Sequence, residues 1–306
     1  MLLRTRSVFT IIEFYFYIRD LFEGTYTLRI LESFFELLIK ITPYFFISIL
    51  IQVLLLKQIQ KREFKFEFKN NVLSISIAAL FGMLSPLPTY AAIPVGLSFV
   101  SLGAPLGAII AFIIASPLIN PSVFFLTITQ LGVTICLSRV VAAFLLALFG
   151  GLLSGPVLKT VTLTKMDDYH PKKQRPFLKE LYRSFLFFGK YFLIALLISA
   201  IVKALVSPQL ITEILGKHIQ QSLLVAIALG VPFYSCGGAA IPFVEVLRDM
   251  GINEGAVLAF FLAGPATKIE TLFVFKSILG LKIFLYYLLI TFIGAYLCGL
   301  ILWVLL

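Results

Sequence analysis

The chain of 306 residues is 60% apolar and carries only 13% charged residues, and its mean hydropathy is +1.04. Soluble domains contain about 25% charged residues, so this composition excludes a water-soluble globule of this length. The formal net charge is +10, but the basic residues lie in short segments beside apolar runs, as in the cytoplasmic loops of membrane proteins. Nucleic acid is therefore not an expected partner.

The cysteines and histidines indicate neither a metal site nor a cofactor. Cys136, Cys236 and Cys298 lie in apolar segments without CxxC spacing, and His170 and His218 lie in polar segments. This pattern fits neither a disulfide framework nor a zinc site, and no cofactor is expected.

The N-terminal segment, residues 1–40, is either amphipathic or membrane-spanning. Its apolar run is interrupted by Glu13, Arg19 and Asp20, and no small-residue cleavage site follows, so it is not interpreted as a signal peptide. These charges leave open whether residues 8–27 cross the membrane or lie at its surface.

The remainder of the chain contains an internal repeat. A shift of 148 residues aligns 91–132 with 239–280 and gives 14 identities in 42 positions without a gap, glycines and prolines included. A shift of 147 extends the similarity upstream, because the Tyr-Phe pairs that begin at positions 44 and 191 then coincide. We predict one repeat over 41–154 and a second over 188–306, joined by a basic linker over 155–187.

Each repeat begins and ends with a long apolar span and holds short apolar pieces between them. In the first copy the segments are 41–56, 72–85, 91–101, 104–116, 121–131 and 132–154. In the second copy they are 188–206, 222–231, 239–250, 254–263, 270–279 and 283–306. The short pieces cannot cross a bilayer alone, so we expect Pro- and Gly-broken or re-entrant helices. The prediction is an all-α integral membrane protein with about 8 to 10 membrane segments.

Charge predicts the orientation of the two copies. The basic segments 57–69 and 155–183 are expected on the cytoplasmic side. The first span of copy one then ends inside the cell, whereas the first span of copy two starts there. This is an inverted-topology repeat, an arrangement common in secondary transporters.

Transporters of this type hold their substrate near the membrane midplane, where the broken segments of the two copies meet. Helix breaks expose carbonyl groups and free N–H groups, which suit an anion or a polar solute. The alternative is that the breaks only allow close packing in a core. The candidate substrate-binding residues are Pro88, Thr89, Tyr90, Pro94, Pro117, Asn120, Pro232, Tyr234, Ser235, Cys236, Gly237, Gly238, Pro242, Pro265, Thr267 and Lys268.

Four charged residues lie in apolar surroundings. Lys268 and Glu270 either contact the substrate or a coupling proton, or reach the wet interface. Arg139 either snorkels to the membrane boundary, the interpretation we favour, or acts as a fixed counter-charge. Glu245 is the best candidate for a proton-coupled carboxylate, and the alternative is an ion pair with Arg248, three residues further on.

Three runs of the sequence resemble a known family. The runs at 103–124, 232–242 and 251–272, together with the basic linker, resemble the predicted permeases of the ArsP and YraQ type, which include trivalent organoarsenical exporters. The resemblance implies a multi-span permease of the bacterial or archaeal inner membrane, and in the exporters it implies a thiol that contacts the metalloid. Here only Cys236 carries that thiol, since Thr89 and Tyr90 lie where family members often have a Cys-Ser-Cys-Gly run. Lys268 replaces an amide of the family's run, which favours an anionic substrate.

The predicted function is a multi-pass permease of the plasma (inner) membrane, not an enzyme, that moves a metalloid, an organoarsenical or another small solute. The alternatives are an intramembrane enzyme and a channel-like membrane subunit. No nucleotide-binding P-loop motif occurs, so ATP hydrolysis by this chain is not expected. The expected partners are the lipid bilayer and the small solute, and a homo-oligomer stays open.

Overall fold

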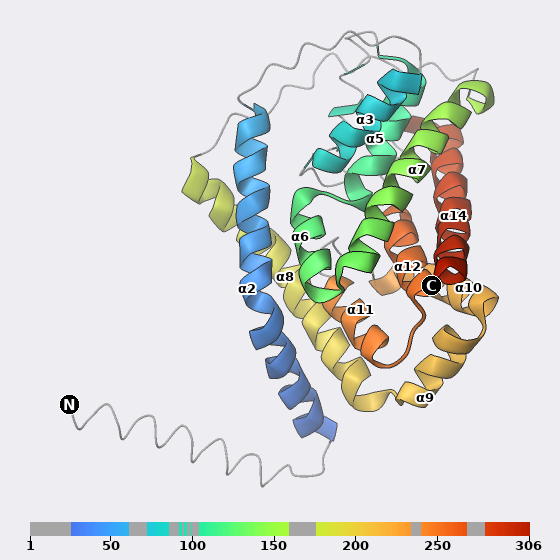
Figure 1. Cartoon of the computed structure of the whole chain (residues 1–306). Helices are drawn as coiled ribbons and strands as arrows, with labels where there is room; N and C mark the ends of the chain where they lie inside the picture. The colour runs from blue at the N-terminus through green and yellow to red at the C-terminus, as the bar shows by residue number, and fades with distance from the viewer. Residues whose placement is uncertain are drawn as a thin grey trace.

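The computed structural model describes residues 26–60, 72–85, 92–93, 95–96, 99, 104–158, 176–233, 240–267 and 279–306. Every regular element within these residues is a helix, as the sequence predicts. Figure 1 shows the helices arranged as a bundle with α2 and α8 along one side. The helices are α2 (Tyr26–Gln60), α3 (Val72–Leu84), α5 (Leu106–Leu118), α6 (Pro121–Gln130), α7 (Val133–Val157), α8 (Phe177–Leu205), α9 (Pro208–Ile211), the π-helical turn η1 (Thr212–Lys217), α10 (Ile219–Phe233), α11 (Ala240–Asp249), α12 (Glu254–Thr267) and α14 (Gly280–Leu305).

Several of these helices have the length and composition of membrane spans. Four described segments qualify, namely Tyr26–Ile51, Leu106–Gln130, Val133–Val157 and Gly280–Leu305. The end of α8 and the α9–η1 segment, which meet at 105°, qualify as a fifth if they are counted together. Helices α3, α10 and α12 are apolar but shorter. The expected total of about 8 to 10 segments stays a prediction.

Helices α2 and α8 begin earlier than the spans predicted at 41 and 188. Helix α2 starts at Tyr26 and continues through Pro43, so it crosses the expected boundary between residues 40 and 41. Its 35 residues extend about 52 Å, well beyond a hydrocarbon core of about 30 Å. A charge-free run measures the part of a helix that tolerates lipid, whereas the helix itself continues into its charged flank.

Helices α5 and α12 lie at the centre of the bundle. Nearly every described residue of both is buried, from Gly107 to Leu118 in α5 and from Gly255 to Thr267 in α12. Both are apolar on all faces, which is the pattern of a helix packed on every side. Helix α12 also runs four residues past the predicted end at 263, and in its last turn the Thr267 hydroxyl donates to the carbonyls of Ala263 and Gly264.

The two copies pack their helices through the same contacts. A Cβ atom at Gly151 of α7 would lie 2.6 Å from the Gly107 carbonyl of α5, and one at Gly299 of α14 would lie 2.7 Å from the Gly255 carbonyl of α12. The other near neighbours are again counterparts at a spacing of 148: Ile75 and Ala111 around Gly151, and Leu223 and Ala259 around Gly299. The turns before α7 and α14 match as well, since Gly132 and Gly280 both have positive φ, at 88° and 79°. The glycine contacts of α7 with α5 thus have counterparts in those of α14 with α12.

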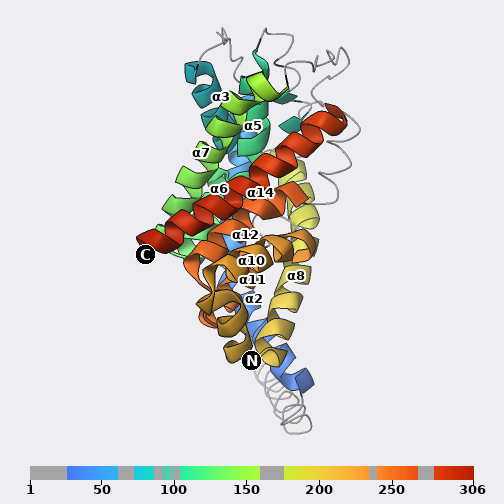
Figure 2. The same cartoon turned by 90° about the vertical axis from the view of Figure 1, so that its right-hand side faces the viewer.

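Helices α7 and α14 each expose an apolar stripe at every fourth position. In α7 the stripe consists of Val133, Leu137, Val141, Leu145, Phe149, Leu153 and Val157. In α14 it consists of the counterparts Leu281, Leu285, Leu289, Ile293, Leu297, Ile301 and Leu305. Figure 2 shows α14 running obliquely across the outer face of the bundle, over α12. A contiguous apolar surface of this kind marks contact with a membrane or a partner rather than with water.

Two pairs of helices, α2 with α8 and α7 with α14, are antiparallel. Glu36 and Phe46 of α2 contact Lys203 and Phe185 of α8, so the order of contacts reverses along the pair. In the same way, Leu146 and Gly150 of α7 meet Gly294 and Ile290 of α14. Figure 1 shows both pairs as antiparallel, with the end of α7 at the top of the view and the end of α14 below.

Candidate functional site

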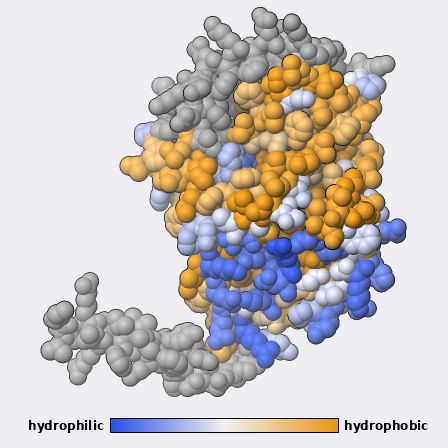
Figure 3. Space-filling view, viewed as in Figure 1, coloured by the Kyte–Doolittle hydropathy of each residue, from blue (hydrophilic) through white to orange (hydrophobic). Residues whose placement is uncertain are grey.

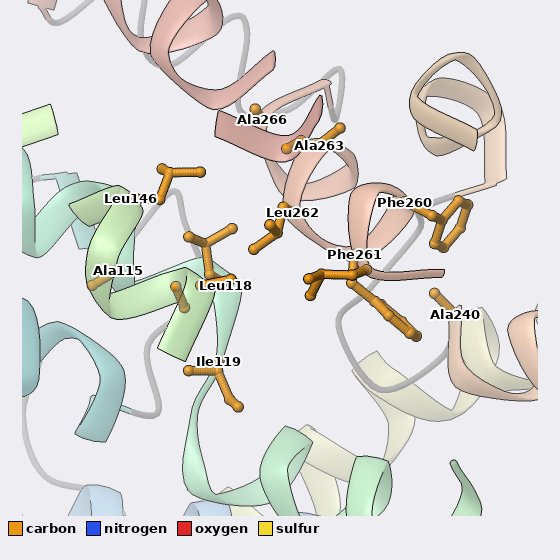
Figure 4. Packing of buried hydrophobic residues seen from close by; sticks show 14 of the residues in the cluster. Ala115, Leu118, Ile119, Leu146, Ala240, Phe260, Phe261, Leu262, Ala263 and Ala266 are labelled. Carbon is orange, nitrogen blue, oxygen red and sulfur yellow. The ribbon is translucent and has the colours of Figure 1, made fainter. Parts of the chain in front are cut away.

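The two copies meet at a central junction, which is made of Leu118, Ile119 and Arg139 from copy one and Phe261 and Leu262 from copy two. These residues are buried. Figure 4 shows Leu118 beside Leu262. Helix α12 contacts both α5 and α7, so the junction joins the central helix of copy two to the α5–α6 break of copy one.

Arg139 lies inside this junction and does not snorkel. Its exposed fraction is 0%, and its Nε donates to the Leu118 carbonyl at 3.1 Å while Nη1 donates to the Thr127 hydroxyl at 3.1 Å. The guanidinium carbon lies 4.1 Å from the centroid of the Phe261 ring. The interpretation that we favoured from the sequence is therefore wrong, because protein groups surround the guanidinium and replace the water that snorkelling would supply.

Arg139 stabilises the carboxyl end of α5. Leu118 is the last residue of α5, and the break at Ile119 leaves its carbonyl without an intrahelical N–H donor. Cations are favourable at helix C-termini because of the negative end of the macrodipole. The flat face of Phe261 adds a cation–π contact from the second copy. One buried cation thus links a break in copy one to an aromatic ring in copy two.

On the other side of the same break, Asn120 is the N-cap of α6. Its Oδ1 accepts a hydrogen bond from the Val123 N–H at 3.0 Å, and Pro121 occupies the first turn of α6, where no N–H is needed. The Asn120 side chain is thus engaged as an N-cap. Pro117 lies within α5, one residue before its end. Substrate contact by Asn120 and Pro117 stays a prediction.

Glu245 forms an ion pair, but with Lys40 rather than with Arg248. Its Oε1 lies 2.6 Å from Lys40 Nζ on α2. Arg248 instead pairs with Glu254 at 2.7 Å and donates to the Leu131 carbonyl of copy one. The sequence does not indicate Lys40 as the partner of Glu245, because this residue stands out there only as the boundary of a charge-free run. Helical spacing on α11 made Arg248 the nearer partner in sequence, but a contact between helices decides the pairing.

The other candidates divide between those that the structure describes and those that it does not. Pro242 and Pro265 lie in α11 and α12, and Pro232 lies in α10. Outside the described residues are Pro88, Thr89, Tyr90, Pro94, Tyr234, Ser235, Cys236, Gly237, Gly238, Lys268 and Glu270. Before the break around Cys236 the described residues end at Phe233 of α10, and after it they begin again at Ala240 of α11.

Comparison with known proteins identifies the family. The profile of a family described as predicted permeases, the ArsP type, matches residues 26–304. The chain belongs to this permease family. It is thus a multi-pass membrane permease, and the resemblance noted in its sequence is confirmed.

Three relatives illustrate the spread of the family. A UPF0718 protein of Bacillus subtilis, YcgR, is 25% identical over 80% of this chain and 87% of its own length. A Streptococcus mutans protein named a putative two-component membrane permease complex subunit is 24% identical over 84% of this chain and 89% of its own. A UPF0718 protein of Methanocaldococcus jannaschii is 27% identical over 35% of this chain and 29% of its own. No solved structure matches the permease.

Proposed function

We propose that the permease is a secondary transporter whose two repeats have inverted topology and enclose one central substrate site. The observation that carries this proposal is that counterpart residues contact each other directly. Phe45 and Phe192 are counterparts at a spacing of 147, and their rings stack with centroids 4.0 Å apart and planes 8° apart. Leu146 and Gly294 are counterparts at a spacing of 148, and a Cβ at Gly294 would lie 3.0 Å from Leu146 Cγ.

Contacts of this kind indicate a two-fold relation between the copies. In a two-fold arrangement the same surface patch meets itself, and only a residue on or beside the axis contacts its own counterpart. Both contacts join antiparallel helices that have the length and composition of spans or adjoin one. An axis that reverses spanning helices lies in the membrane plane, which is the inverted-repeat arrangement of secondary transporters.

The orientation follows from the basic segments. In our proposal repeat 1 (41–154), the linker (155–187) and repeat 2 (188–306) follow the N-terminal segment (1–40). The ends of α2 and α7, which lead into the two basic segments, both lie toward the top of Figure 1. The positive-inside rule assigns that side to the cytoplasm, in the inner membrane of a bacterium or an archaeon.

We place the substrate site between the repeats, next to the central junction, and propose that residues of the breaks around Thr89 and Cys236 contribute to it. We propose a metalloid, an organoarsenical or another small solute as cargo. A soft metalloid would bind the Cys236 thiolate, whereas Lys268 favours an anionic cargo. The name of the Streptococcus relative extends the proposal to assembly with a second subunit or a second copy.

Labelling of counterpart positions tests the inverted topology. Thr134 at the start of α7 and Lys282 at the start of α14 are counterparts, and both are exposed and polar. In a variant without native cysteines, we expect an impermeant maleimide to label Lys282→Cys from the cytoplasmic side and Thr134→Cys from the opposite side. Labelling of both from the same side would contradict the inverted repeat.

Transport by reconstituted protein tests the function itself. We expect proteoliposomes to move a trivalent methylated arsenical or an oxyanion in proportion to an imposed proton gradient, and a flux independent of the gradient would favour a channel-like subunit. Cys236→Ser is expected to abolish arsenical transport, whereas Cys136→Ser, whose thiol is buried on α7, serves as the matched control. Equal arsenical transport by both variants would exclude thiol ligation.

A further inference from the structure

We propose that Glu245 and Lys40 form a proton-exchange site, in which the buried carboxylate binds either the Lys40 ammonium or a proton. The exchange is a property of this ion pair alone, whereas its role in coupling rests on the proposed transport function. The proton comes from water, and Lys40 keeps its own proton when it leaves. The carboxylate is thus neutralised in both states.

The geometry of the pair is asymmetric in a way that suits exchange. The Glu245 side chain is 7% exposed, whereas the Lys40 side chain is 54% exposed. Oε1 is held by Lys40 at 2.6 Å, but Oε2 is buried and has no hydrogen-bond partner among the described residues. A buried carboxylate oxygen without a donor is costly, and a proton on Glu245 lowers that cost by removing the charge. The flexible Lys40 stem allows the ammonium to withdraw to water.

The helices around Glu245 carry few charged groups that could compete with Lys40. Helix α11 packs against α8, α6 and α12, and α6 carries no charged residue. On α8, Lys203 is paired with Glu36 of α2. On α12, Glu254 is paired with Arg248. Asp249 and Glu36 act on Lys40 from a distance; within the described part of the chain, Lys40 is the one cation at ion-pair distance from Glu245.

Water reaches the pair from one end of the bundle. Figure 3 shows an apolar surface over the upper part of the molecule and a hydrophilic zone over the lower ends of α2, α8 and α11. The exposed pair of Glu36 and Lys203 lies one turn of α2 away from Lys40. Because the Lys40 side chain is 54% exposed, water contacts the cationic end of the pair directly.

Helix α11 connects the pair to the proposed substrate site. The helix begins at Ala240, directly after the segment that contains Cys236, and it contacts α12, which carries Phe261 of the central junction. Glu245 is five residues further along, about 7.5 Å of helix rise. The ion pair of Lys40 and Glu245 connects α11 of copy two to α2. A proton on Glu245 breaks this ion pair, so that substrate binding and proton binding can influence each other.

Infrared difference spectra between pH 8 and pH 4 test the exchange without any substrate. In the reconstituted wild-type permease we expect acid to produce a protonated-carboxyl C=O band that Glu245→Gln lacks. In Lys40→Met the band is expected at higher pH, because the competing ammonium is gone, and Lys40→Arg is expected to restore wild-type behaviour. The matched control is Glu32→Gln, an exposed carboxylate two turns earlier on α2, which should leave the Glu245 band unchanged.

The absence of any Glu245-dependent band in the wild-type protein would overturn the proposal. A transport arm then separates exchange from coupling. In proteoliposomes that move an arsenical or oxyanion, we expect Glu245→Gln to retain solute exchange at equal concentrations but to lose accumulation driven by a proton gradient. A Glu245 band together with no transport of any solute would refute the proposed function while leaving the exchange site supported.

Discussion

The repeated glycine contacts predict that one methyl group has the same effect in either copy. Substitution of Gly151→Ala in α7 or Gly299→Ala in α14 adds a Cβ at the closest approach of two helices. At Gly151 this atom would lie 2.6 Å from the Gly107 carbonyl, where ordinary contact begins at 3.4 Å, a shortfall of 0.8 Å. At Gly299 the distance to the Gly255 carbonyl is 2.7 Å, a shortfall of 0.7 Å. A backbone carbonyl cannot rotate away, so the helices must separate.

The cost of that separation is the cost of overpacking a close contact. Inserting a methyl group into a packed core costs about 1–3 kcal/mol, and small residues at helix interfaces in membranes exist to permit this approach. Because the neighbours of the two glycines are counterparts and none is shared, we expect similar losses in the two variants. The double variant should lose the sum of the two.

Thermal unfolding of the purified permease in detergent measures these losses. The control is Gly189→Ala in α8, where an added Cβ would have no neighbour within 4 Å and where alanine favours the helix by about 0.5–1 kcal/mol. We expect both interface variants to unfold at lower temperature than the control. An unfolding temperature of Gly151→Ala equal to that of Gly189→Ala, or a loss in only one copy, would refute the argument that the copies pack alike.

Three further predictions concern single side chains. Arg139→Lys should cost about 1.5–3 kcal/mol of stability, because an ammonium cannot reach the Leu118 carbonyl and the Thr127 hydroxyl in the fork geometry of the guanidinium. The control Arg183→Lys, on the exposed surface of α8, should change the stability by less than about 0.5 kcal/mol. Asn120→Ala should cost about 0.5–2 kcal/mol through loss of the α6 cap, and Asn120→Ser should recover most of it in the same melt. Glu36→Gln, which breaks the exposed pair with Lys203, should cost at most about 1 kcal/mol, and a larger or salt-independent loss would show that this pair is shielded from water.

The helical class and the apolar spans could be predicted from the sequence, because both depend on local composition. Lipid tolerates only segments whose side chains are apolar over enough residues, so hydropathy alone located most helices. The Gly and Pro identities in 91–132 and 239–280 reflect close approaches such as that of Gly107 to Gly151. The family resemblance rested on the same runs and was confirmed over residues 26–304.

The partners of the charged side chains were decided by the tertiary structure. From the spacing in the sequence, Arg248 was the predicted partner of Glu245, and Arg139 was predicted to reach the membrane boundary. A linear pattern shows only which residues are neighbours along the chain. The fold instead brings Lys40 to Glu245 from 205 positions away and encloses Arg139 between Leu118 and Phe261. The strength of an ion pair or a cation–π contact depends on distance and burial, and both quantities exist only once the two repeats have packed against each other.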